Sequence, residues 1–267
     1  MNNNAIGIIG GSGLYRLFTS HEVSYATTSY GSPSSPVQIG SIGETKVYFI
    51  SRHGLNHEIP PHKVNYKANI QALYNLGVRR IIATHALGAL NPSMSPGDFV
   101  ISDQFVNKAF GRDDTFFNGP DTVHISTSDP FCEDLRTQVE GTIQELKYKY
   151  HDKGIMAIIQ GPRFSTRAEN SLLYKEGNDV ISMTGYPECV LAREKGICYV
   201  SVGFITDIAC VLGSSLHPQN PTTHTEVVRT FEASIEKIIS VLKVTVPKIN
   251  SDNFPCNCMH SLEGAKN

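Results

Sequence analysis

The stretch best suited to chemistry is residues 198–209, CYVSVGFITDIA, because it presents a carboxylate after an apolar run. The run is almost unbroken and rich in β-branched residues, which is typical of a strand covered by helices on both faces. It stops at Thr206 and Asp207. Ligands of open α/β sheets bind beyond the carboxyl ends of the strands, so Asp207 is a candidate acid for proton transfer to a small molecule. The alternative is that Asp207 caps a following turn or helix.

A glycine-rich turn follows the first apolar segment and is suited to holding a phosphate. Residues 5–9 predict a short strand, which leads directly into the sequence GGSG at residues 10–13. Backbone N–H groups in such a turn can approach an anion closely, and Ser12 adds a hydroxyl at its centre. The turn lacks the third glycine of the dinucleotide-binding G-x-G-x-x-G motif, so a Rossmann dehydrogenase is disfavoured.

Cationic and imidazole side chains gather after a second predicted strand, residues 46–51. Arg52 and His53 follow it directly, and His57 and His62 lie further on. Arginine keeps its charge and offers a planar set of donors, so the cluster favours an inorganic anion. Three histidines also suggest a metal, but no cysteine or paired carboxylate is nearby, and two prolines between the histidines exclude helical i, i+4 geometry. We expect an anion site and no metal.

The remaining pattern alternates strands and helices, which predicts an α/β fold with parallel, right-handed connections. Small residues at 85–91 predict a second turn able to bring backbone amides near a ligand. Residues from about 251 onward are expected to be disordered. Further strands are expected at residues 80–84, 99–102, 155–160 and 179–183. Helices are expected at residues 64–76, 130–148, 187–195 and 224–242, and from residue 165 or 166.

The composition indicates a globular protein and argues against nucleic-acid and membrane partners. The 267 residues are 40% hydrophobic and 18% charged, which is too apolar for a disordered chain. We expect one domain at residues 1–250 and a C-terminal tail at 251–267. A formal net charge of -2 with scattered Lys and Arg makes nucleic acid and membrane surfaces poor partners. Without a spanning apolar run or a basic leader, we expect a cytoplasmic protein.

The six cysteines fall into two groups. Those at positions 132, 189, 198 and 210 lie in apolar surroundings, where cysteine usually acts as a small core residue. Cys256 and Cys258 instead form a Cys-Asn-Cys pair in a polar tail. One such pair supplies too few ligands for a closed zinc site, which takes four. A tail disulfide, a redox role and an ordinary exposed terminus all remain open.

An ordered set of motifs covers nearly the whole chain. In sequence order they read GIIGGSG, RHGxxH, GxLN with PGDFVISDQF, GPRFSTRAE, MTGYPE and TDxxC. The set resembles the trimeric purine nucleoside phosphorylase family, in particular its methylthioadenosine branch. The resemblance implies one α/β domain with a twisted, mixed and partly barrel-like central sheet flanked by helices, in trimers or dimers of trimers. It also implies phosphorolysis of a purine nucleoside without metal or organic cofactor, phosphate being a co-substrate.

The resemblance also assigns site residues. It implies that phosphate is bound by Ser12, Arg52, His53, the backbone of Ala86, and Thr184. The substrate would contact Met183 below the ribose and Phe164 near the base, with His57, His224, Val227 and Val228 as further binding residues. His124 matches a residue that family members contribute to a neighbour's site. Asp207 would face the purine N7 and exocyclic group and donate a proton to the departing base, whose negative charge develops in the transition state.

Three departures leave the substrate open. Ala209 stands where the methylthioadenosine branch usually carries a second aspartate, so recognition of a 6-amino group depends more heavily on Asp207. His85 replaces the Thr, Ser or Asn that relatives place against phosphate. His224 stands where that branch has valine, and it resembles the histidine with which other members bind a 5'-hydroxyl. Ser165, however, matches the aminopurine members.

The resemblance therefore predicts conversion of S-methyl-5'-thioadenosine and phosphate to adenine and 5-methylthioribose 1-phosphate. The alternatives are a phosphorylase for adenosine, inosine or methylthioinosine. From another class, a nucleoside-binding protein that has lost turnover is also open.

Overall fold

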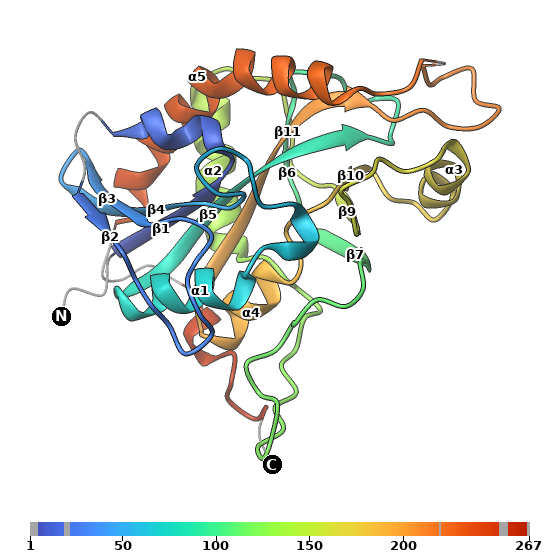
Figure 1. The fold of residues 1–267 in the computed structure, drawn as a ribbon. Coiled ribbons are helices and arrows are strands. Elements are labelled where there is room, and N and C mark those ends of the chain that lie inside the picture. Colours follow the sequence, from blue (N-terminus) through green and yellow to red (C-terminus); the bar gives the residue numbers. More distant parts are fainter. Residues whose placement is uncertain (1–4, 19–21, 219, 251–255, 266–267) are drawn as a thin grey trace.

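Two long parallel strands, β5 (Val78–Ala89) and β11 (Cys198–Ile208), form the centre of the fold (Figure 1). The structure is a computed structural model that describes residues 5–18, 22–218, 220–250 and 256–265. Both strands are buried along most of their length, as apolar strands covered on both faces should be. β1 (Ala5–Gly10) pairs with β5 in parallel on the side away from β11.

The sheet is mixed and branches at β5. One path runs β2-β3-β4-β1-β5-β10-β9-β7, and β11, β6 and β8 extend from β5 as a branch. Among the described strands neither path closes on itself, so the expected mixed sheet is confirmed but it forms no closed barrel. The remaining strands are β2 (Glu22–Ser24), β3 (Val37–Ile42), β4 (Thr45–Ser51), β6 (Phe99–Ile101), β7 (Gln104–Lys108), β8 (Tyr150–His151), β9 (Ile155–Ile159) and β10 (Val180–Ser182).

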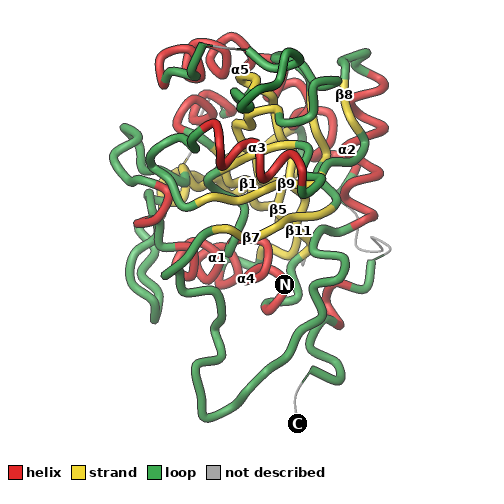
Figure 2. Tube along the Cα trace, turned by 90° about the vertical axis from the view of Figure 1, so that its right-hand side faces the viewer, coloured by secondary structure: helices red, strands yellow, loops and turns green. Residues whose placement is uncertain are grey.

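Helices cover the sheet in two pairs. α1 (Tyr66–Asn75) packs with α4 (Glu188–Glu194), and α2 (Glu133–Glu145) packs with α5 (His224–Lys248). Figures 1 and 2 show α5 above the strands and α1 and α4 below them. The buried apolar side chains form two main clusters, one that includes residues of α2 and α5 and one that includes residues of α1 and α4. No helix in the described part of the chain is long and apolar enough to cross a membrane. The other helical elements are α3 (Arg167–Lys175) and the 3-10 turns η1 (Ser12–Leu17), η2 (Pro61–Lys63) and η3 (Cys258–His260).

The predicted elements are present, with three corrections. Residues 85–89 continue β5 instead of turning, because pairing with β10 and β11 completes their backbone hydrogen bonds. α5 runs six residues beyond the predicted end at 242. Residues 256–265 form η3 and a turn, so the expected disorder is wrong for them, while 251–255 and 266–267 lie outside the described residues.

Candidate active site

A cavity of about 650 Å³ lies where β1, β4, β10 and β11 end, beside β5. This volume falls in the range of small-molecule sites, and the location is the one expected for ligands of α/β sheets. The cavity brings together most of the side chains that the sequence singled out. Those that line it are Arg52, His53, His57, Ala86, Phe164, Met183, Thr184, Asp207, His224, Val227 and Val228.

Arg52 is held in place by an acid far away in sequence. Its Nε and Nη2 each donate to the Glu188 carboxylate at 2.8 Å, and Nη1 donates to the Thr84 carbonyl at 2.9 Å. These bonds account for three of the five N–H groups of a guanidinium. Burial lowers the pKa of Arg52, but the charge of Glu188 more than offsets this, so the group stays cationic. Arg52 therefore presents a fixed positive charge to the cavity.

The imidazole of His53 is neutral. Its Nδ1 donates to the Ile59 carbonyl at 2.9 Å, which leaves Nε2 as a hydrogen-bond acceptor. Burial, then the nearby charge of Arg52, lower the pKa of His53 to about 4. Nε2 of His53 can therefore accept a hydrogen bond from a protonated oxygen of a ligand, but the ring adds no positive charge near pH 7. The cationic character expected of this cluster belongs to Arg52.

Thr184 belongs to a buried chain of hydrogen bonds. Its hydroxyl lies 2.9 Å from Nδ1 of His85, whose Nε2 lies 3.3 Å from the Tyr199 hydroxyl. Tyr199 in turn donates to Glu188 at 2.7 Å. Because the Tyr199 proton points to the carboxylate, His85 donates through Nε2 and accepts from Thr184 through Nδ1. Burial, followed by the charge of Arg52, holds the pKa of His85 well below its usual value, so this ring is neutral too.

Asp207 is aimed into the cavity by an irregularity in β11. The register between β11 and β5 shifts between Ile205 and Asp207, so that Asp207 lies opposite Gly88. Such bulges re-aim side chains at active sites. Its two carboxylate oxygens accept hydrogen bonds from Thr206 at 2.8 Å and from Thr222 at 2.9 Å. Burial nevertheless raises the pKa of Asp207, which favours a proton on this carboxyl relative to an exposed aspartate.

β5 sets the separation between the guanidinium of Arg52 and the carboxyl of Asp207. Arg52 is bonded to Thr84, Asp207 lies opposite Gly88, and Ala86 is halfway between them. Four residues of extended strand span about 13 Å. The cavity therefore has a permanent cation and a carboxyl at separate positions along one rigid strand.

One face of α5 supplies an apolar wall. Val227, Phe231 and Ile235 recur at helical spacing on the cavity side, and Val228 lies beside them. Gly13 lets η1 approach this helix, because a Cβ at that position would lie 2.3 Å from a methyl group of Ile235.

His224 begins α5 at the mouth of this wall. Thr223 caps the helix by a reciprocal pair of hydrogen bonds with Glu226, so His224 has no capping role. The His224 ring lies 6.1 Å from that of His57, and the latter stacks on His53 at 4.7 Å. Burial, followed by the charge of His224, lowers the pKa of His57. A line of three imidazoles thus connects the Arg52 end of the cavity to the apolar wall.

Two predicted site residues have a different outcome. The side chain of Ser12 lies outside what the structure describes, although its backbone begins η1 and its neighbours Gly11 and Gly13 line the cavity. His124 is exposed and is absent from the described lining of the cavity. Its backbone N–H donates to the Ala265 carbonyl at 2.9 Å.

Sequence reasoning missed the partners that support the site. Glu188 accepts hydrogen bonds from Arg52 and Tyr199. Thr222 donates a hydrogen bond to Asp207. Glu188 opens the mostly apolar stretch 188–192, and an acid at the start of such a stretch was a signal for Glu188, because an acid that becomes buried needs a partner. No local pattern marked Tyr199 or Thr222.

The fold and the cavity define an α/β protein whose small-molecule site has a fixed cation at one end and an apolar helix face as a wall. A family model described as "Phosphorylase superfamily" matches residues 5–246. The chain belongs to this family, and the sequence-based recognition is confirmed.

Named relatives agree with this assignment. The S-methyl-5'-thioadenosine phosphorylase of Pyrococcus abyssi is 46% identical over 258 residues, which cover 97% of both chains. The enzyme of the same name from Saccharolobus solfataricus is 42% identical, over 98% of this chain and 96% of its own. Among solved structures, methylthioadenosine phosphorylase from Schistosoma mansoni in complex with adenine superposes with a TM-score of 0.91 at 32% identity, covering 98% of each chain.

Proposed function

We propose that this protein cleaves S-methyl-5'-thioadenosine with inorganic phosphate, giving adenine and 5-methylthioribose 1-phosphate. The observation that carries the proposal is that a fixed guanidinium, a buried carboxyl whose pKa is raised by that burial, and an apolar helix face line one cavity. The names of relatives that are 41–46% identical over most of the chain support the substrate.

In the proposed arrangement phosphate lies at the end of the cavity where Arg52 is fixed. The guanidinium charge of Arg52 offsets the negative charge of the phosphate, and its free N–H groups donate to phosphate oxygens. Ser12 and the backbone at Ala86 complete the phosphate site. His53 and Thr184 act mainly as acceptors, because their protons are committed to Ile59 and His85. They therefore favour a phosphate that still carries a proton.

The glycosidic bond is cleaved by displacement at C1' of the ribose. The bond from C1' to the purine nitrogen breaks, a phosphate oxygen forms a bond to C1', and the base takes a proton at N7 from Asp207. Positive charge on the ribose faces the phosphate, and negative charge on the base faces the acid, so both groups act selectively on the transition state. Met183 lies below the ribose and Phe164 beside the base in this arrangement, and no cofactor beyond phosphate takes part.

A second substrate, adenosine, has a specific observation in its favour. His57 and His224 lie next to each other at the cavity, where either ring could bond a 5'-hydroxyl. Val227 and Val228 instead suit a methylthio group. We expect methylthioadenosine to be preferred and adenosine to be cleaved more slowly.

Release of free base distinguishes the candidates. It is measured for methylthioadenosine, adenosine, inosine and methylthioinosine, each with and without phosphate. Phosphate-dependent release of adenine, fastest from methylthioadenosine, supports the proposal. Faster release from an oxopurine nucleoside would assign another phosphorylase, and binding without any release would assign the non-catalytic alternative.

The working enzyme is proposed to be a homotrimer or a dimer of trimers, in which His124 of one copy completes the cavity of the next. His124 is exposed and outside its own described cavity, which supports this role. Mixing tests it: His124→Ala and Asp207→Asn are each impaired alone, and co-assembled chains regain activity at interfaces that join intact Asp207 to intact His124. No recovery in verified mixed oligomers would contradict the proposal.

A further inference from the structure

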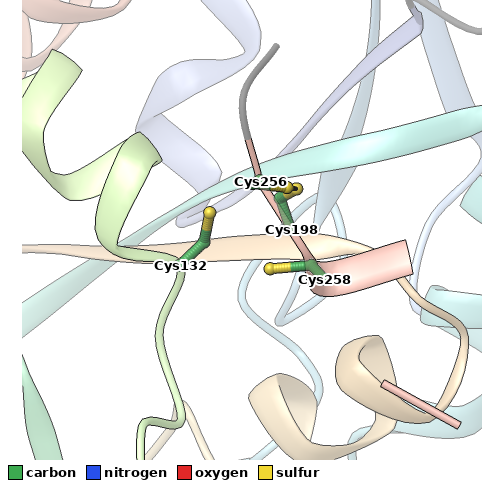
Figure 3. Close-up of side chains that lie close together, drawn as sticks. All are labelled: Cys132, Cys198, Cys256 and Cys258. Atoms are coloured by element: carbon green, nitrogen blue, oxygen red, sulfur yellow. Dashed lines mark hydrogen bonds between the residues drawn. The ribbon is translucent and has the colours of Figure 1, made fainter. Parts of the chain in front are cut away.

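Four cysteines from three distant parts of the chain lie close together at the start of β11, the end of the strand away from Asp207. Cys132 precedes α2, Cys198 begins β11, and Cys256 and Cys258 come from the C-terminal segment. All four Sγ atoms lie within 4.8 Å of one another (Figure 3). The Cys-Asn-Cys pair, which alone has too few ligands for zinc, therefore has two further thiols beside it.

We propose that Cys132, Cys198, Cys256 and Cys258 bind one zinc ion as a closed tetrathiolate site. Structural zinc sites take four ligands in a tetrahedron with Zn–S distances near 2.3 Å, which places the sulfurs about 3.8 Å apart. That separation lies inside the limit within which all four sulfurs are found here. The sulfurs of Cys198 and Cys256, now 2.8 Å apart, would have to separate by about 1 Å to reach it.

The surroundings suit thiolates. Cys132 occupies the N-cap of α2, a helix of 13 residues, and its side chain makes no capping hydrogen bond there. A negative sulfur at a helix N-terminus is stabilised by the unpaired N–H groups and the helix dipole.

Zinc fits this cluster better than the alternatives. All six cysteines are free, and the Sγ atoms of Cys198 and Cys256 are 2.8 Å apart, longer than the roughly 2.05 Å of a disulfide bond. Two disulfides would draw the sulfurs into separate pairs, whereas here the four converge. Tetrahedral sulfur sites suit zinc and iron, and for a given site zinc binds more tightly than ferrous iron.

The proposed site joins the C-terminal segment to the core. Cys198 begins the strand that carries Asp207 near its other end. Beyond Cys258, Ser261 donates to the Arg193 carbonyl at 2.6 Å, and Ala265 accepts from the backbone N–H of His124. An ion that fixes Cys256 and Cys258 therefore also steadies the loop that carries His124.

Metal analysis of the full-length protein tests the proposal. Protein purified without chelators should contain about one zinc ion per chain. The double variant Cys256→Ser with Cys258→Ser should lose it, whereas Cys189→Ala, which removes a buried thiol in α4 outside the cluster, should retain it. Iron in place of zinc, or zinc retained by the double variant, overturns the assignment.

Two further measurements exclude failure by misfolding or oxidation. Cobalt(II) loaded in place of zinc should show the strong visible bands of a tetrahedral thiolate site, and a chelator should remove them and lower the melting temperature. In the denatured chain all six thiols should react with a thiol reagent, and the unreacted chain should have the mass expected for six reduced cysteines. A mass lower by four hydrogens would identify two disulfides instead, and metal-free protein that cannot be loaded would overturn the proposal.

Discussion

Arg52 binds Glu188 through two parallel hydrogen bonds of 2.8 Å, although neither side chain is more than 2% exposed. The two residues are 136 positions apart, and Tyr199 bonds to the same carboxylate. A buried charge of either sign needs its partner, so each member fixes the other. Glu188 and Tyr199 are therefore positioning residues for the cation that faces the cavity.

Removing one member of the Arg52–Glu188 pair should lower the free energy of unfolding. Arg52→Ala leaves the Glu188 carboxylate buried without its main donor, and we expect the free energy of unfolding to fall by about 3 to 5 kcal/mol. Chemical denaturation measures the change. Arg163→Ala is a matched control, because Arg163 forms the same two-bond pair with Glu169 on the surface and should change stability little. Equal losses in the two variants would contradict the role of burial.

Phosphate binding should depend on the shape of the guanidinium as well as its charge. Arg52→Lys keeps the positive charge but cannot bond Glu188, Thr84 and a ligand with one planar group. We expect the phosphate KM to rise at least about tenfold, with a smaller change in the nucleoside KM. A variant that folds normally and has an unchanged phosphate KM would place the anion elsewhere.

His53 should make stability depend on pH. Its pKa is about 4 in the folded protein, below the usual value of 6.5, so between these values the unfolded chain binds more protons and stability rises with pH. About 2 kcal/mol should be lost between pH 7.5 and pH 5. His53→Gln should flatten this part of the profile relative to wild type. Parallel profiles for His53→Gln and wild type would show that His53 does not contribute.

The sequence indicated the residues that line the cavity better than the partners that hold them. Arg52 and Thr184 follow apolar strands and Asp207 lies near the end of one, and strand ends can be read from local periodicity. Glu188 and Thr222 reach the site from segments whose approach depends on the whole topology. The same limit hid the cysteine cluster, because Cys132 and Cys198 have the apolar neighbours of ordinary core residues.

The end of β5 shows how tertiary contacts override local pattern. Residues 85–89 contain small residues and a glycine, which predict a turn. β10 and β11 pair with this segment and keep it extended. Gly88 is needed there for a packing reason, since a Cβ would lie 2.9 Å from Ile181 and 3.3 Å from the Asp207 carboxylate.

Asp207 should control cleavage of 6-aminopurine nucleosides through its proton. Asp207→Asn keeps a hydrogen bond but cannot donate a carboxylic proton, so cleavage of these nucleosides should fall by roughly 10² or more, with relative preference moving toward 6-oxopurines. Thr222→Val is the companion variant. It removes a bond that lowers the pKa of Asp207, so the pKa rises and the alkaline limb of kcat/KM should move to higher pH. Wild-type cleavage rates in Asp207→Asn would make Asp207 a structural residue.

His224 should set the tolerance for a 5'-hydroxyl. The apolar wall of Val227 and Val228 gains from burying a methylthio group, at about 25 cal/mol per Å², whereas a buried hydroxyl needs a partner that His224 can supply. His224→Val should shift the ratio of kcat/KM toward methylthioadenosine over adenosine by about 1 to 3 kcal/mol, and Val228→Thr should shift it the other way. Thr225→Val, on the same turn but absent from the described lining, is the control. Equal ratios in wild type and His224→Val would leave the 5' specificity to the valines and His57.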